Sequence, residues 1–219
     1  TRRGSQFTLG LKITPPYSLI KGTTDAQYAQ MTTSEKYNLL EYHKWKFSGK
    51  VFTPLSADSK LVLMARAEFG YLGHYNKNVK SPFESYYMGG DGMSSYSSYS
   101  TEYIAMRGYQ SGSLTPYDPA TGRNMGYVFN KFTMELRYPI ALEQNATIWA
   151  LAFVEAGNCF ADIRDYNPFN LKRSAGIGVR LFLPMFGLMG IDWGWGFDPI
   201  NGSTQYGGSQ FHFVLGQEL

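Results

Sequence analysis

Apolar and polar residues alternate one by one along much of the chain, a period typical of β-strands with one apolar face. In the first such segment Phe7, Leu9 and Leu11 alternate with polar residues and glycine. Seven further segments repeat this pattern. The eight predicted strands are Ser5–Thr14, Glu41–Thr53, Leu61–Gly73, Tyr127–Tyr138, Thr147–Asn158, Leu171–Leu183, Leu188–Asp198 and Ser209–Leu219.

The connections between the predicted strands alternate in length. A polar loop over residues 15–38 follows the first strand, and the connections after the third, fifth and seventh strands are also long. A transmembrane β-barrel has lipid-facing apolar side chains, a polar lumen, short periplasmic turns and long extracellular loops. We therefore predict an all-β fold, an antiparallel transmembrane β-barrel. A soluble sandwich or a lipocalin-type barrel is the alternative, because alternation alone fits it too.

The composition agrees with this fold class. The chain of 219 residues contains 17 Tyr, 15 Phe and 24 Gly, which favours strands and turns. Its net charge of +3 is too small, and its Lys and Arg too scattered, to indicate binding to nucleic acid. No run reaches the roughly 18 apolar residues of a membrane helix. Cys159 is the only cysteine, so an internal disulfide is excluded and a packed small residue is expected.

An arginine in the longest loop, Arg107, follows an apolar pair and precedes Gly108 and Tyr109. A long loop on a wide barrel can fold into the lumen, where a guanidinium group pairs well with carboxylates on the strands. Glu135 and Glu155, on the next two predicted strands, are the candidate partners. Spacing alone leaves the alternative open that Arg107 is an exposed loop residue.

Stretches along the whole chain resemble, in order, the BamA family of polypeptide-transporting outer-membrane barrels. YIAMRGYQSGSL resembles the family's loop motif, an apolar residue followed by Arg, Gly and Phe or Tyr. The other stretches are SPFESYYMGGDG before the motif, KFTMELRYPI and AFVEAGN in the next two strands, LKRSAGIGVRLFLPMFGLMGIDWGWGFD as the penultimate hairpin and SQFHFVLGQEL as the terminal strand. Their shared order makes the resemblance specific.

The resemblance implies a sixteen-stranded barrel preceded by periplasmic POTRA domains. Residues 1–219 would then be the second half of that barrel domain, and the opening TRRGSQFTLG indicates a fragment of a longer protein. In the family the motif arginine reaches from an inward-folded loop to acidic groups on the following strands, which by position are Glu135 and Glu155. This sequence departs from the family in carrying Met106 before Arg107, Glu instead of Asp in the fifth strand, and a longer loop.

The resemblance further implies a core component of the machinery that folds and inserts β-barrel proteins into the outer membrane of a Gram-negative (diderm) bacterium. The terminal strand would form a lateral seam that offers free backbone groups to an incoming strand. Its candidate residues are Gln210, Phe211, His212, Phe213 and Gly216. Gly216 would weaken or bend the strand, or simply make room in the lumen. His212 would be a structural residue of the lumen.

The implied partners are nascent outer-membrane β-barrel proteins, accessory assembly lipoproteins and outer-membrane lipid, with no nucleic acid, metal or cofactor. A sister polypeptide exporter and a passive outer-membrane channel are the alternatives, since both would share the barrel. An enzyme is not expected. Only His43, His74 and His212 are present, with no Ser/Asp constellation beside them in the sequence.

Overall fold

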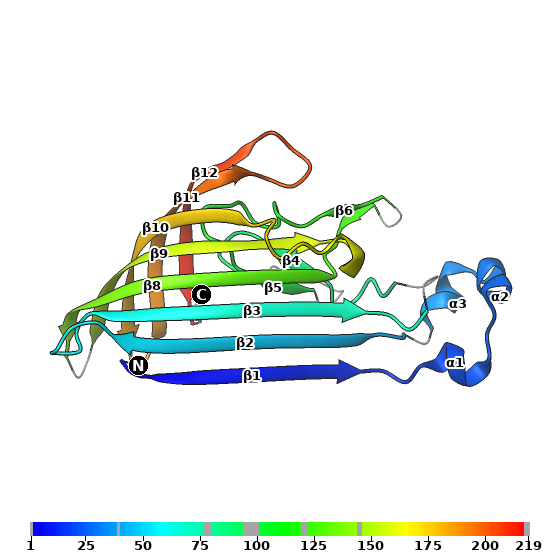
Figure 1. Cartoon of the computed structure of the whole chain (residues 1–219), viewed down its shortest axis with the longest axis horizontal. Helices are drawn as coiled ribbons and strands as arrows, with labels where there is room; N and C mark the ends of the chain where they lie inside the picture. The colour runs from blue at the N-terminus through cyan, green and yellow to red at the C-terminus, as the bar shows by residue number, and fades with distance from the viewer. Residues whose placement is uncertain are drawn as a thin grey trace.

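The structure is a computed structural model that describes residues 2–38, 40–76, 80–93, 101–119, 122–143 and 146–216. Eight long strands form one antiparallel sheet in the order of the sequence (Figure 1), which confirms the all-β class and the eight predicted strands. The strands are β1 (Gly4–Ile13), β2 (His43–Pro54), β3 (Val62–Gly73), β8 (Val128–Leu142), β9 (Thr147–Phe160), β10 (Lys172–Leu183), β11 (Gly187–Pro199) and β12 (Tyr206–Leu215).

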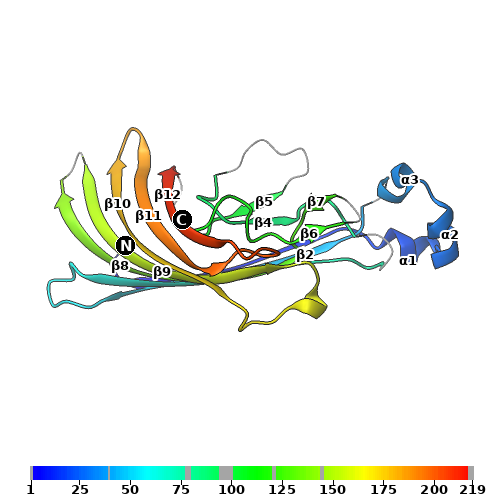
Figure 2. The ribbon, with the colours of Figure 1, turned by 90° about the horizontal axis from the view of Figure 1, so that it is seen from above.

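The sheet curls from β8 to β12, so that one face is concave (Figure 2). We call this concave face the inner face and the opposite one the outer face. Among the described residues, β1 pairs only with β2 and β12 pairs only with β11. The sheet therefore has two edges, one at each end of the strand order.

The outer face is apolar along its whole width, as the two-residue alternation predicts. Trp193, Trp195 and Phe197 on β11 lie beside Phe211 and Phe213 on β12, and all five are substantially exposed. The same face carries Phe7, Leu9 and Leu11 on β1, Trp45 and Phe47 on β2, Phe132, Met134 and Leu136 on β8, Val154 on β9, and Ile177 and Val179 on β10. An outer face of this kind suits contact with lipid.

The connection between β1 and β2 contains three short helices where the sequence analysis expected only a polar loop. They are α1 (Tyr17–Lys21), α2 (Asp25–Gln30) and α3 (Thr33–Tyr37). Thr24 and Thr32 each form a capping box with the residue three positions later. The two-residue alternation that predicted the strands does not detect this pattern. No helix in the described part of the chain is long and apolar enough to cross a membrane.

The connection between β11 and β12 is shorter than predicted. It comprises residues 200–205, similar to the link of residues 55–61 between β2 and β3. Both strands continue past a register shift between Gly196 and Pro199, and the hairpin extends beyond the neighbouring strands (Figure 1). The alternation of long and short connections therefore holds for the earlier links and fails at the last one.

The loop between β3 and β8 folds back onto the inner face (Figure 2). It contains two short strand pairs, β4 (Tyr86–Met88) with β5 (Glu102–Ile104) and β6 (Tyr117–Asp118) with β7 (Arg123–Asn124). We call this segment the inward loop; its Ser- and Tyr-rich residues 94–100 lie outside the described part.

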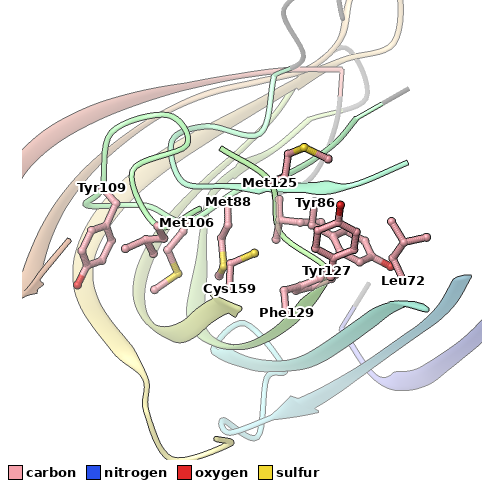
Figure 3. Close-up of a cluster of buried hydrophobic side chains, with 11 residues drawn as sticks. Leu72, Tyr86, Met88, Met106, Tyr109, Met125, Tyr127, Phe129 and Cys159 are labelled. Carbon is pink, nitrogen blue, oxygen red and sulfur yellow. The ribbon is translucent and has the colours of Figure 1, made fainter. Parts of the chain in front are cut away.

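The inward loop shares a hydrophobic core with the inner face of the sheet (Figure 3). Met88 and Met106 from the loop are fully buried, as are Tyr86 and Phe129, whose rings meet edge to face at 4.7 Å. Cys159 is a buried free thiol in the same cluster, in agreement with the expectation of a packed small residue. Removal of this much apolar surface from water stabilises the folded-back position of the loop.

Candidate functional site

Arg107 lies within the inward loop, fully buried against the inner face, and five of its N–H···O contacts reach carboxylates. Its Nη2 donates to Glu135 Oε1 at 2.7 Å and to Glu155 Oε1 at 2.8 Å. Its backbone N–H donates to Glu155 Oε2 at 2.8 Å, and its Nε to Glu155 Oε1 at 3.1 Å. A third acid, Asp192, accepts from Nη1 at 3.2 Å. One side chain thus connects the loop to β8, β9 and β11.

Each carboxylate around Arg107 has a second cationic partner on the sheet itself. The pairs are Glu135 with Arg137 at 2.6 Å, Glu155 with Lys131 at 3.1 Å and Asp192 with Arg180 at 2.5 Å. A buried charge is tolerated when it is paired and hydrogen-bonded. The sheet therefore presents three carboxylates, each already paired with a cation of the sheet, to the loop arginine.

Arg107 remains charged in this buried position. Burial alone would lower the pKa of the Arg107 guanidinium, but the charges of Glu155, Glu135 and Asp192 outweigh that effect and raise it. The guanidinium also stacks on Phe153, with Cζ 3.6 Å from the ring centroid.

Gly108 brings the loop backbone into direct contact with the backbone of β11. Its φ of +84° lies in the left-handed region, and an added Cβ would meet Gly196 N and Trp195 C at 2.8 Å. Gly194 faces the same point, since a Cβ there would lie 2.8 Å from Gly108 N. The glycines that alternate with tryptophans in β11 thus leave space on the inner face for the motif.

The N–H of Gly108 donates to Nε2 of His212 on β12 at 2.8 Å. His212 is 4% exposed, so it faces the inner side as expected. Because Nε2 accepts this bond, the neutral ring carries its proton on Nδ1. The motif therefore touches the edge strand of the sheet directly.

Tyr109 completes the motif and is fully buried. Its hydroxyl donates to the Arg173 carbonyl at 2.8 Å and accepts from the Asp198 N–H at 3.3 Å. Burial raises the pKa of the Tyr109 hydroxyl to about 12. The hydroxyl therefore links the loop to both β10 and β11 as a neutral group.

The structure places the predicted seam residues on both faces of β12. Gln210 and His212 point inward, and the Gln210 amide donates to the Gly207 carbonyl at 3.2 Å. Phe211 and Phe213 point outward and away from the motif.

The two predicted roles of Gly216, a weak or bent point in the strand and space in the lumen, stay predictions. Gly216 follows the last residue of β12 and has a φ of +70°, and among the described residues no atom lies within 4 Å of the position of an added Cβ. Its backbone conformation, not crowding, is what favours glycine there. The remainder of the predicted terminal strand, residues 217–219, lies outside the described residues.

Sequence reasoning missed Asp192 and the second cations, Lys131, Arg137 and Arg180. Asp192 lies in mid-strand on the glycine-bearing face of β11, so its face was readable from the alternation. Its contact with Arg107 joins residues 85 positions apart, and the alternation carries no information about such a distance. Within the described ranges, no group of three or more His, Cys, Asp or Glu could hold a metal ion.

Known proteins resemble this chain in fold and in family. The crystal structure of BamA from Haemophilus ducreyi lacking POTRA domains 1-3 matches with a TM-score of 0.62 and 19% sequence identity. The match covers 97% of this chain and 38% of the BamA chain, and at this identity it concerns the fold alone. No curated protein matches the chain. The Omp85 superfamily domain model matches residues 6–219, and the chain therefore belongs to the Omp85 superfamily of outer-membrane β-barrel proteins.

Proposed function

We propose that this chain is part of a factor that folds and inserts β-barrel proteins into the outer membrane of a Gram-negative bacterium. Membership of the Omp85 superfamily supports a role in polypeptide insertion or transport at the level of the family. The site around Arg107 argues against a passive channel, because such a channel has no evident need for a buried loop arginine that contacts three acids.

The observation that carries the proposal is the contact of the inward loop with the edge strand. Gly108 donates to His212 on β12. Arg107 beside it contacts acids on β8, β9 and β11, and β11 pairs directly with β12. An edge strand has unpaired N–H and C=O groups that an incoming strand can use, largely independent of its sequence. In this mechanism β12 forms the lateral seam, and the loop motif holds the neighbouring strands in place while that edge is available.

The proposed partners are unfolded outer-membrane β-barrel proteins, which would pair with β12, and the lipid that surrounds the outer face. Accessory lipoproteins, preceding POTRA domains and the other half of a larger barrel belong to the same proposal. The apolar outer face supports the lipid contact. The free edges of β1 and β12 in the described sheet are compatible with additional strands on either side.

The proposal is tested by depletion of the protein in its own cells, followed by quantification of all outer-membrane barrels by mass spectrometry. We expect a general decrease in folded barrels and an accumulation of unfolded ones in the periplasm. Complementation with the wild-type chain should restore them, whereas Arg107→Glu should not. Loss of a single exported protein would instead indicate a dedicated exporter, and loss of a single solute's uptake would indicate a channel.

A further inference from the structure

We propose that Glu84 and Glu102 on the inward loop, together with Lys12, Lys44 and Lys46 on β1 and β2, form a second docking site. The loop would then be a brace across the inner face that holds β1 and β12, the first and last strands of the described sheet, at a defined separation. The biological meaning of this brace rests on the proposed function, since β12 is the proposed seam. Its geometry can be tested independently of any assembly activity.

Glu84 connects the loop to the first two strands. Its Oε2 lies 2.9 Å from Lys12 Nζ on β1 and 3.1 Å from Lys44 Nζ on β2, and its backbone carbonyl accepts from Lys44 Nζ at 2.9 Å. Its φ of +64° is uncommon for a residue other than glycine. Such a conformation persists where surrounding contacts hold it, and the two lysines supply those contacts.

Glu102, on β5, repeats the arrangement one step further along β2. Its carboxylate lies 2.8 Å from Lys44 Nζ and also binds Lys46 Nζ. Lys44 is therefore shared by both acids, and its side chain is only 4% exposed. Its ammonium also lies 4.7 Å from the centroid of the Tyr86 ring. Lysine is almost never buried without partners, so the loop completes the environment that Lys44 requires.

The two docking sites are joined by paired backbone within the loop. β4 and β5 pair in parallel, which connects the neighbourhoods of Glu84 and Glu102. Gly90 N–H donates to the Tyr109 carbonyl at 3.0 Å, and Met106 N–H donates to the Gly90 carbonyl at 3.0 Å. Backbone bonds thus link the acids to the Arg107 motif, and the loop reaches from Lys12 on β1 to His212 on β12.

The two sites lie toward opposite ends of the strand order in the described sheet. A loop attached at both sites crosses the concave inner face of this curved sheet directly from one site to the other. Loss of the lysine site should leave the Arg107 motif docked, while β1 and β2 become free to move relative to β12. The separation of the two edges is therefore the quantity that distinguishes a brace from a loop attached at one end.

The experiment measures the distance between spin labels on β1 and β12 by pulsed electron–electron double resonance, with the protein in its native outer membrane. Leu9→Cys on β1 and Phe211→Cys on β12 supply the label sites. Both side chains point outward, and they are 70% and 68% exposed. The native Cys159 is buried and escapes labelling. The tested variant is Glu84→Gln with Glu102→Gln.

The matched control is Glu68→Gln, which removes a shielded ion pair with Arg66 at 3.0 Å within β3 and leaves both acids of the loop unchanged. We expect a broader distance distribution, shifted to longer distances, in the double variant and not in Glu68→Gln. Lys44→Arg, which keeps the charge, should retain the narrow distribution. Lys12→Gln removes only the exposed contact to β1, so it should fold normally and broaden the distribution in part.

An unchanged distribution in both the double variant and Lys12→Gln would overturn the brace. Equal broadening in Glu68→Gln would also overturn it, because the effect would then follow from any lost ion pair. If the distances respond as expected but depletion of the protein leaves other barrels intact, the brace stands and the proposed assembly function fails.

Discussion

The inward loop is held at two places that use opposite arrangements of charge. At the motif site one loop cation, Arg107, enters a group of acids on the strands, and it is fully buried. At the lysine site two loop acids reach cations on the strands, and the side-chain exposure of those cations ranges from 4% at Lys44 to 62% at Lys12. Because exposed pairs are screened by water and salt, the motif site should dominate the energetics.

The two sites also differ in how closely the loop backbone approaches the sheet. Gly108 lies directly on the backbone of β11, where any side chain would clash. At the lysine site the long, flexible lysine side chains cover the distance between loop and strand. The motif site therefore requires one geometry, whereas the lysine site can tolerate small displacements.

Arg107→Glu should have the largest effect. The change places a fourth carboxylate among Glu135, Glu155 and Asp192, and breaking a buried charge pair costs about 3–5 kcal/mol. We expect a lower urea midpoint of unfolding, measured by the loss of the heat-modifiable band on gels, together with failed complementation. Arg173→Gln, which removes an exposed pair with Asp198, is the control. If the Arg107 variant were as stable as the wild type, the motif site would not be the stronger of the two attachments.

Gly108→Ala should come next, because it keeps every charge and changes only the fit. A left-handed backbone in a residue other than glycine costs about 1–3 kcal/mol, and the clash with β11 adds to that. We expect the loop to become accessible to added protease in native membranes. Gly202→Ala has the same backbone demand, at a φ of +75°, but open space around its Cβ. Equal protease sensitivity in both variants would show that close approach is unimportant.

Lys44→Gln should weaken the lysine site by an intermediate amount, about 1–3 kcal/mol, because two acids lose a shielded partner. Lys12→Gln should change stability by only ~0.2–1 kcal/mol, as is usual for exposed ion pairs. Urea unfolding of the two variants, side by side, measures the difference. A larger effect at Lys12 than at Lys44 would contradict the ranking by burial.

Acidification to below pH 4.5 should release the lysine site. Burial raises the pKa of Glu102, but hydrogen bonds and charges from Lys44 and Lys46 outweigh it, so the pKa is lowered overall; Glu84 behaves likewise with Lys12 and Lys44. Their contribution to stability is complete above pH 4.5, the ordinary pKa of a glutamate, and is lost as the pH falls through the lower folded value. The distance between the labels on β1 and β12 should therefore broaden on acidification, and no such change should follow in Glu84→Gln with Glu102→Gln.

Tyr109→Phe should have the smallest effect among the motif residues. It removes the hydroxyl that binds the Arg173 carbonyl and the Asp198 N–H, while the ring keeps its packing. A loss of about 0.5–1.5 kcal/mol is expected for each neutral hydrogen bond, and the longer bond from the Asp198 N–H should contribute least. Urea unfolding measures it, and a loss as large as that of Arg107→Glu would show that the tyrosine, not the arginine, holds the loop.

The alternation of apolar and polar residues was enough to predict the eight long strands and the face of each side chain. The strict alternation in β11, with Trp193 and Trp195 between glycines, assigns an apolar side and a small-residue side without further information. The Arg-Gly-Tyr motif and its resemblance to a known family pointed to Arg107, Glu135 and Glu155. The capping boxes at Thr24 and Thr32 could also have been predicted from the sequence. They lie in a segment without the two-residue alternation, which was therefore predicted to be a loop.

The contacts between inward-facing groups depend on the three-dimensional fold. Alternation states the face of a residue, but not which residue of a distant strand or loop it will meet across the curled sheet. Asp192 therefore joined Arg107, and Glu84 and Glu102 met lysines of β1 and β2, without any local signal. These contacts depend on the curl of the sheet and on the path of the inward loop, which arise from packing over the whole chain.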